Sequence, residues 1–186
     1  MNITVYLGAR EGKDPTLKDA VRELGTWIGN NGNRLVYGGS KTGLMGELAA
    51  SVLQAGGCVT GVETRFFMEE GVQYDGLTEL IVTETMPERK TRMIELGDAF
   101  LAFPGGTGTL EEISEVMAKV ALGQLSAPCI LYNWNGYYNS LRELLAHMVR
   151  MGLASEEQLT GIRFADSLDD IRTILDSPVS RTSPTL

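Results

Sequence analysis

The chain alternates between two patterns of apolar and polar residues. Short apolar runs bounded by glycine, proline or charged residues are typical of strands that are buried on both faces of a sheet. These runs lie at residues 3–7, 34–37, 58–62, 77–83, 99–103, 128–132 and 162–164. Between them, apolar residues recur every three or four positions, which is the spacing of an amphipathic helix. This spacing predicts helices over residues 15–30, 44–55, 86–96, 110–122, 138–151 and 167–175, and a helical turn at 156–158.

Strands that alternate with helices predict a parallel sheet with helices on both faces, so we expect a three-layer α/β/α fold in a single domain. We expect this domain to cover residues 1–176, and residues 177–186, which are rich in Ser and Pro, to form a flexible tail. Ligands of open parallel sheets bind outside the carboxyl ends of the strands. The glycine-rich loops of this chain follow predicted strands, so they should meet at that edge.

The strongest candidate for a ligand site is the sequence AFLAFPGGTGTLEE at residues 99–112. A predicted strand is followed there by Pro104, a glycine-rich loop and a helix start, and this arrangement suits a phosphate group. Glycine allows close approach of the backbone, and the N–H groups and dipole of a helix start favour an anion. The same residues also form a capping box, in which Thr109 caps the helix and Glu112 folds back onto the cap. Both interpretations can hold together.

A second glycine-rich loop, GGSKTG at residues 38–43, also joins a predicted strand to a predicted helix. It is not a Walker A loop, which needs Gly, Lys and Ser or Thr in direct succession. The loop either lines the same ligand site or forms a tight turn that Thr42 caps. Residues 64–76 show no clear period and form either a mobile loop over the site or packed irregular structure.

The formal net charge of −8 argues against a nucleic-acid backbone as the main partner, because such binding needs a basic surface. A small phosphate ligand in a local positive pocket is still compatible with this charge. No apolar run approaches the roughly 20 residues that a membrane helix needs. The chain starts directly with a strand pattern and without the features of a signal peptide, so we expect a cytoplasmic protein with no membrane partner.

Few residues of this chain are suited to hold a metal. Cys58 and Cys129 lie in separate strand patterns and are expected to be reduced core residues. His147 is the only histidine, and its helical surroundings predict a position on the helix surface. These residues cannot build a usual zinc site, so we expect no metal site and no cofactor.

Four segments together resemble the Lonely Guy (LOG) family. Residues 104–112 match its signature PGGxGTxxE, and residues 37–46 are similar to its YGG…GLMG loop. Residues 86–90, MPERK, are similar to its MHxRK segment, and residues 135–141 to its later GYYNSL stretch. The resemblance extends from about residue 3 to about residue 175, and the combination is far more specific than the glycine loop alone.

The resemblance implies a Rossmann-like, doubly wound fold and a homodimer. It also implies hydrolysis of the N-glycosidic bond of a cytokinin riboside 5′-monophosphate, or of AMP, to the free base and ribose 5-phosphate. Similar proteins have also been called lysine decarboxylases, but the sequence offers no context for a pyridoxal Schiff-base lysine. The alternative is a nucleotide-binding or carrier protein that uses the same loops without hydrolysis.

Carried over by position, the resemblance implies that Arg89 and Glu112 are the catalytic pair. The residues expected to bind the substrate are Gly39, Ser40, Met45, Glu70, Lys90, Gly105, Gly106, Thr107, Gly108, Thr109, Leu110 and Glu111. The chain departs from the usual family pattern at Ser40, Pro87, Thr107 and Lys119. These departures concern the preferred base and leave the reaction class intact.

The chemistry of the bond suits this pair. Breaking the C1′–N bond places positive charge on the ribose, and a carboxylate can stabilise that charge or orient the attacking water. The helix dipole is expected to keep Glu112 ionised, and Arg89 can bind phosphate or carboxylate bidentately. No residue is an obvious acid for the leaving base. For the homodimer, Met117, Val120 and Leu122 either meet the partner or face the sheet.

Overall fold

A computed structural model describes residues 1–177 of the protein. Its sheet has seven parallel strands in the order β4-β3-β2-β1-β5-β6-β7. The strands are β1 (Asn2–Tyr6), β2 (Arg34–Tyr37), β3 (Cys58–Thr64), β4 (Glu79–Thr83), β5 (Ala99–Ala102), β6 (Cys129–Tyr132) and β7 (Ile162–Ala165). The helices are α1 (Pro15–Asn30), α2 (Gly43–Gln54), α3 (Arg65–Glu69), α4 (Met86–Leu96), α5 (Thr107–Ala121), α6 (Asn139–Arg150), α7 (Glu156–Leu159) and α8 (Leu168–Asp176).

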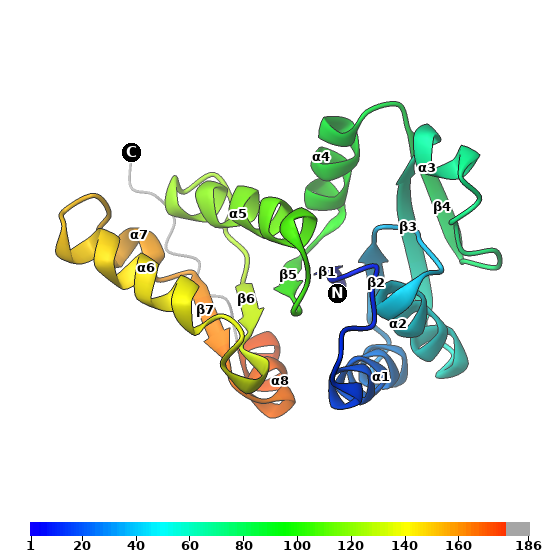
Figure 1. The fold of residues 1–186 in the computed structure, drawn as a ribbon, viewed down its shortest axis with the longest axis horizontal. Coiled ribbons are helices and arrows are strands. Elements are labelled where there is room, and N and C mark those ends of the chain that lie inside the picture. The colour runs from blue at the N-terminus through cyan, green and yellow to red at the C-terminus, as the bar shows by residue number, and fades with distance from the viewer. Residues whose placement is uncertain (178–186) are drawn as a thin grey trace.

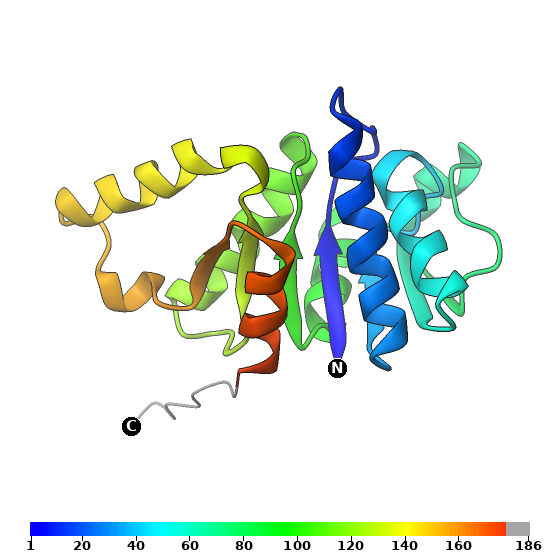
Figure 2. The same ribbon diagram turned by 90° about the horizontal axis from the view of Figure 1, so that it is seen from below.

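The helices cover both faces of the sheet, which confirms the predicted doubly wound α/β fold. Helices α1, α2 and α8 lie on one face, and α4 and α5 lie on the other (Figure 1). Figure 2 shows α1 and α8 on the first face, with β1 visible between them. Successive strands are added outward from β1 as far as β4, and the chain then returns to place β5 on the other side of β1. The connections therefore diverge between β1 and β5, which is where such sheets bind ligands.

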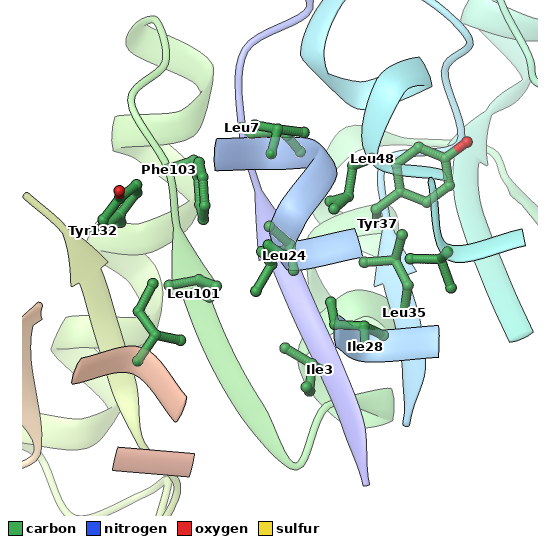
Figure 3. Close-up of a cluster of buried hydrophobic side chains, with 14 of the residues drawn as sticks. Ile3, Leu7, Leu24, Ile28, Leu35, Tyr37, Leu48, Leu101, Phe103 and Tyr132 are labelled. Carbon is green, nitrogen blue, oxygen red and sulfur yellow. The ribbon is translucent and has the colours of Figure 1, made fainter. Parts of the chain in front are cut away.

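The core consists of two clusters, one on each face of the sheet. Successive side chains of a strand point to opposite faces, so Leu101 belongs to one cluster and Phe100 to the other. In the first cluster, Leu24 and Ile28 of α1 pack near Ile3 and the other strand residues (Figure 3). Burial on both faces explains why these strands are unbroken apolar runs in the sequence.

The observed elements agree closely with the predicted ones, and side chains cap several helix starts. Asp14 accepts a hydrogen bond from the N–H of Thr16 at 2.9 Å, and Ser167 forms a capping box with Asp170. The predicted box at Thr109 is wrong, because α5 begins three residues earlier than expected, with Gly106 as its N-cap. Thr109 therefore lies inside the first turn, packed so closely on Gly105 that a Cβ at residue 105 would collide with its hydroxyl.

Residues 65–76 contain structure that the sequence pattern did not predict. The short helix α3 is followed by a segment that pairs with the loop after β2. The N–H of Lys41 donates to Val72 O at 2.8 Å, and the N–H of Tyr74 donates to Gly39 O at 2.9 Å. These bonds join the segment to the second glycine-rich loop.

Four further expectations have different outcomes. Cys129 is a buried free thiol as predicted, but Cys58 is exposed because it is the first residue of β3. Met117 is buried, and Val120 packs against the core cluster that contains Phe100. Of the three residues proposed for the dimer, only Leu122 is therefore exposed.

His147 lies on the helix surface as predicted. The predicted flexible tail, apart from Ser177, lies outside the described residues.

Within residues 1–177, no helix is both long enough and apolar enough to cross a membrane. The same part of the chain contains no group of three His, Cys, Asp or Glu side chains arranged to hold a metal ion.

Candidate functional site

A cavity of about 860 Å³ lies at the carboxyl ends of the central strands. The loops after β1, β2, β3 and β5 form its walls, together with the first turns of α4 and α5. This volume falls in the range of pockets that hold small molecules and cofactors. The cavity therefore occupies the edge of the sheet that the glycine-rich loops predicted.

One end of the cavity is built for an anion. Gly105, Gly106 and Thr107 line it, and no side chain caps α5. The N–H groups and dipole of this helix start are thus available to a phosphate. The first glycine loop reaches the same place from β1, since a Cβ at Gly8 would lie 3.5 Å from Gly105 Cα.

Two side chains at this end were not predicted from the sequence. Arg10 follows β1, is exposed, lines the cavity, and forms no ion pair with another described residue. The hydroxyl of Tyr137 donates a hydrogen bond to Gly105 O at 2.6 Å and so ties the glycine loop to the segment before α6. Arg10 could have been identified as a lone cation in a glycine-rich loop directly after a strand.

Arg89 of α4 lies at the centre of the cavity and is almost fully buried. Its Nη1 donates to Glu112 Oε1 at 2.8 Å. Its Nε donates to Val62 O at 2.9 Å, and its Nη2 donates to Gly38 O at 3.3 Å. The guanidinium is thus fixed by two strand-end carbonyls and one carboxylate, and a Cβ at Gly38 would collide with it.

Glu112 of α5 faces the cavity, with a side chain that is 12% exposed. The structure therefore brings together the two residues that the sequence placed on different helices. Burial raises the pKa of the Glu112 carboxyl, and the neighbouring Arg89 opposes that rise. The expected effect of the helix dipole is weak here, because Glu112 lies beyond the first turn, where the dipole has largely decayed. The ion pair with Arg89 is the main interaction that favours its charged form.

A second buried carboxylate, Glu63, also lines the cavity and was not predicted as a site residue. It is the penultimate residue of β3, its side chain is 3% exposed, and its Oε1 lies 3.6 Å from Arg89 Nε. Burial raises the pKa of the Glu63 carboxyl, and Arg89 again opposes the rise. A glutamate that directly continues an apolar strand run was the sequence signal for this position.

Most of the residues predicted to bind substrate do line the cavity. They are Ser40, Met45, Glu70, Gly105, Gly106, Thr107, Gly108, Thr109 and Glu111. Three others, Gly39, Lys90 and Leu110, do not.

Each of these three has a clear structural position. Leu110 is exposed on the outer side of α5, and Lys90 binds Glu111 at 2.7 Å and Glu115 at 3.2 Å. Gly39 has a φ of +80° and packs closely against Glu63. A Cβ at residue 39 would lie only 3.1 Å from Glu63 Cβ. Only glycine adopts this backbone conformation easily.

The five lysines of the chain all lie among the described residues, and none of them lines the cavity. A pyridoxal Schiff base needs a lysine amine beside the cofactor. The cavity therefore does not suit that chemistry.

Comparison with known proteins identifies the family. A family model described as "Possible lysine decarboxylase" matches residues 45–175. A cytokinin riboside 5′-monophosphate phosphoribohydrolase from Rhodococcoides fascians is 37% identical over 178 residues, which are 95% of this chain and 90% of that protein. An Arabidopsis thaliana protein of the same name is 36% identical, with 96% of this chain and 84% of that protein covered.

Solved structures with the same fold include proteins of a different kind. The molybdenum cofactor carrier protein from Chlamydomonas reinhardtii has a TM-score of 0.71 at 19% identity and covers 95% of this chain and 98% of its own. The molybdenum cofactor binding protein from Rippkaea orientalis has a TM-score of 0.69 at 23% identity, with 94% of each chain covered. At these identities the likeness concerns the fold alone.

The family is decided by the sequence relatives, which match almost the whole chain at more than a third identity. This chain therefore belongs to the Lonely Guy family of cytokinin riboside 5′-monophosphate phosphoribohydrolases.

Proposed function

We propose that this protein hydrolyses the N-glycosidic bond of a purine riboside 5′-monophosphate, of the cytokinin or the adenosine type. The products are the free base and ribose 5-phosphate. Membership of the family supports this reaction. The structural observation that carries it is the buried ion pair of Arg89 and Glu112, which lines the same cavity as the glycine loop.

The 5′-phosphate is held by the glycine loop after β5 and the start of α5. Arg10 adds a positive charge from the loop after β1. Binding by backbone N–H groups and a flexible arginine needs no metal ion. We expect turnover to persist in EDTA, and loss of activity that a divalent ion restores would contradict this arrangement.

With the phosphate in this position, the ribose lies within reach of Glu112. As the C1′–N bond breaks, positive charge develops on the ribose, and the Glu112 carboxylate stabilises it or orients the attacking water. Arg89 holds that carboxylate in place, and its own position is set by Val62 O and Gly38 O. A fixed charge in a buried site stabilises a developing charge more strongly than the same charge does in water.

Turnover of AMP and isopentenyl-AMP tests this function directly. We expect release of the free base together with ribose 5-phosphate, measured by chromatography. A thermal-shift measurement with the same nucleotides reports binding separately. If the nucleotides raise the melting temperature but no base is released, the protein is a binding or carrier protein and the proposal fails.

We further propose that the protein is a homodimer. Leu122, Leu144, Met151 and Leu153 are exposed large apolar residues at the end of α5, on α6 and after it. A two-fold contact is the most common way for a soluble protein to cover such surface. Light scattering at micromolar concentration should give twice the chain mass, and a monomer would exclude the dimer.

A further inference from the structure

Glu63 is a buried carboxyl group in the cavity to which the reaction described above gives no role. Its side chain is 3% exposed, and it belongs to a strand whose preceding residues are all apolar or small. Burying a carboxyl group without full pairing is unfavourable, so a functional reason for its position is expected.

The contacts of Glu63 are few. Its Oε1 accepts a hydrogen bond from the N–H of Thr64 at 2.9 Å. The same Oε1 lies 3.6 Å from Arg89 Nε, which already donates to Val62 O. Its Oε2 makes no hydrogen bond with any residue in 1–177. One oxygen is therefore held as an acceptor, and the other is free to carry a proton toward the cavity.

The charges around Arg89 do not balance when both carboxyl groups are ionised. One guanidinium faces both Glu112 and Glu63, so one negative charge is left in a buried site, and the two carboxylates repel each other. Glu112 takes the short, charge-assisted bond at 2.8 Å, which keeps it ionised. Glu63 has only the longer contact with Arg89, and its Oε2 has no hydrogen-bond partner in residues 1–177, so it is the group that retains the proton.

Other titratable groups near Glu63 do not change this assignment. The hydroxyl of Tyr37, on β2, is buried without a hydrogen-bond partner among the described residues, and burial raises its pKa, so it stays neutral. Glu70 lies at the exposed side of the same cavity and can only add negative charge. Burial raises the pKa of Glu63, and only Arg89 and the N–H of Thr64 oppose this.

The strand order places Glu63 at the end of the cavity where the base is expected. Three strand spacings separate β5 from β3, which amounts to about 14 Å. A nucleotide with its phosphate on the loop after β5 and its ribose over Glu112 therefore extends its base toward the end of β3. The apolar side chains of Met45, on the helix after β2, and of Phe67, on the helix after β3, line the cavity together with Glu63.

We propose that Glu63 is the general acid that protonates the purine as it leaves, an assignment that rests on the proposed hydrolysis. The C1′–N9 bond breaks with its electron pair going to the base, and the proton of Glu63 Oε2 is transferred to a purine nitrogen. Water forms the new bond to C1′ and releases a proton to Glu112. Transfer of one proton through solvent from Glu112 to Glu63 restores the starting state, so one water is consumed in each cycle.

Two substrates separate this role from a structural one. AMP has a purine leaving group that needs protonation, whereas 4-nitrophenyl ribose 5-phosphate has a leaving group that departs without an acid. For Glu63→Gln we expect turnover of AMP to fall by about a hundredfold or more, and turnover of the nitrophenyl substrate to fall by less than about tenfold. Glu69→Gln, an exposed neighbour on α3 outside the cavity, serves as the control.

The pH profile of the unmodified protein provides a second measurement that does not depend on a variant or on the nitrophenyl substrate. With AMP, kcat should fall as the pH rises through the raised pKa of Glu63, because the acid must be protonated. Glu63→Gln should remove this alkaline fall. Equal losses on both substrates, a change confined to KM, or an alkaline fall that persists in Glu63→Gln would each exclude Glu63 as the acid. Absence of base release by the unmodified protein would instead reject the hydrolase function itself.

Discussion

Two adjacent residues of α4 form ion pairs with two adjacent residues of α5, but their surroundings differ. Arg89 binds Glu112 inside the cavity, where the side chains are 7% and 12% exposed. Lys90 binds Glu111 at the surface, where the glutamate is 61% exposed. The sequence shows the same pattern twice, a cation on one helix and a glutamate on the next. Only the buried pair can exert a strong electrostatic effect, because water screens the exposed one.

The largest effect is expected for Arg89→Ala, which removes the partner of the Glu112 carboxylate and the neighbour of the buried Glu63 carboxyl group. Loss of one partner from a buried ion pair costs about 3–5 kcal/mol. We expect that loss of stability at pH 8, together with a fall in turnover of about a hundredfold or more. Urea unfolding and steady-state kinetics measure the two effects. A variant with unchanged stability would show that Arg89 does not stabilise the buried charge of Glu112.

The next effect is expected for Glu112→Gln. Glutamine keeps the shape of the side chain but removes the charge, so turnover should fall by about a hundredfold. AMP binding should change much less, because the glycine loop is untouched. Steady-state kinetics with a melting curve measures both. Near-normal turnover would leave the proposed mechanism without its main residue.

A smaller effect concerns stability and pH. The pKa values of Glu63 and Glu112 are both raised in the folded protein above their ordinary value of 4.5. The native state then binds protons more tightly than the unfolded state, so this contribution to stability is complete below pH 4.5 and is lost as the pH rises through the folded pKa values.

We therefore expect the local contribution of this pair to the melting temperature to decrease from about pH 5 to pH 8. For a domain of this size, each kcal/mol corresponds to about 2–4 °C. The decrease should be smaller in Glu63→Gln, and melting curves of the two proteins across this range measure the difference. Parallel curves would show that Glu63 does not take up a proton in this range.

The smallest effect is expected for Glu115→Gln, which removes one of the two carboxylates that pair with Lys90 outside the cavity. Surface ion pairs contribute about 0–1 kcal/mol, and salt screens them. Turnover should match that of the unmodified protein, so this variant is the matched control for Glu112→Gln on the same helix. A loss of activity comparable to that of Glu112→Gln would remove the contrast between the buried and the exposed pair.

The sequence predicted much of the fold because most elements have a strong local pattern. The bounds of α1 and β2 are the same in the prediction and in the structure, since Pro15 and the Asn-rich turn mark the helix and the apolar run marks the strand. The start of α5 was missed by three residues, because glycines and threonines show no helical period. Cys58 was misplaced because an apolar run does not reveal which of its end residues reaches solvent.

The sequence by itself determined the α/β architecture, the edge of the sheet at which the glycine loops meet, and the identity of Arg89 and Glu112 as candidate partners. The first two follow from the period of the apolar residues and from the glycine-rich loops after the strands, and the third follows from the resemblance to the Lonely Guy family. The tertiary structure alone decided that Arg89 faces two carboxyl groups, and that Lys90 and Leu110 lie outside the cavity. Burial and charge balance depend on segments that are far apart in the chain, and a local pattern carries no information about how deeply they enclose a side chain.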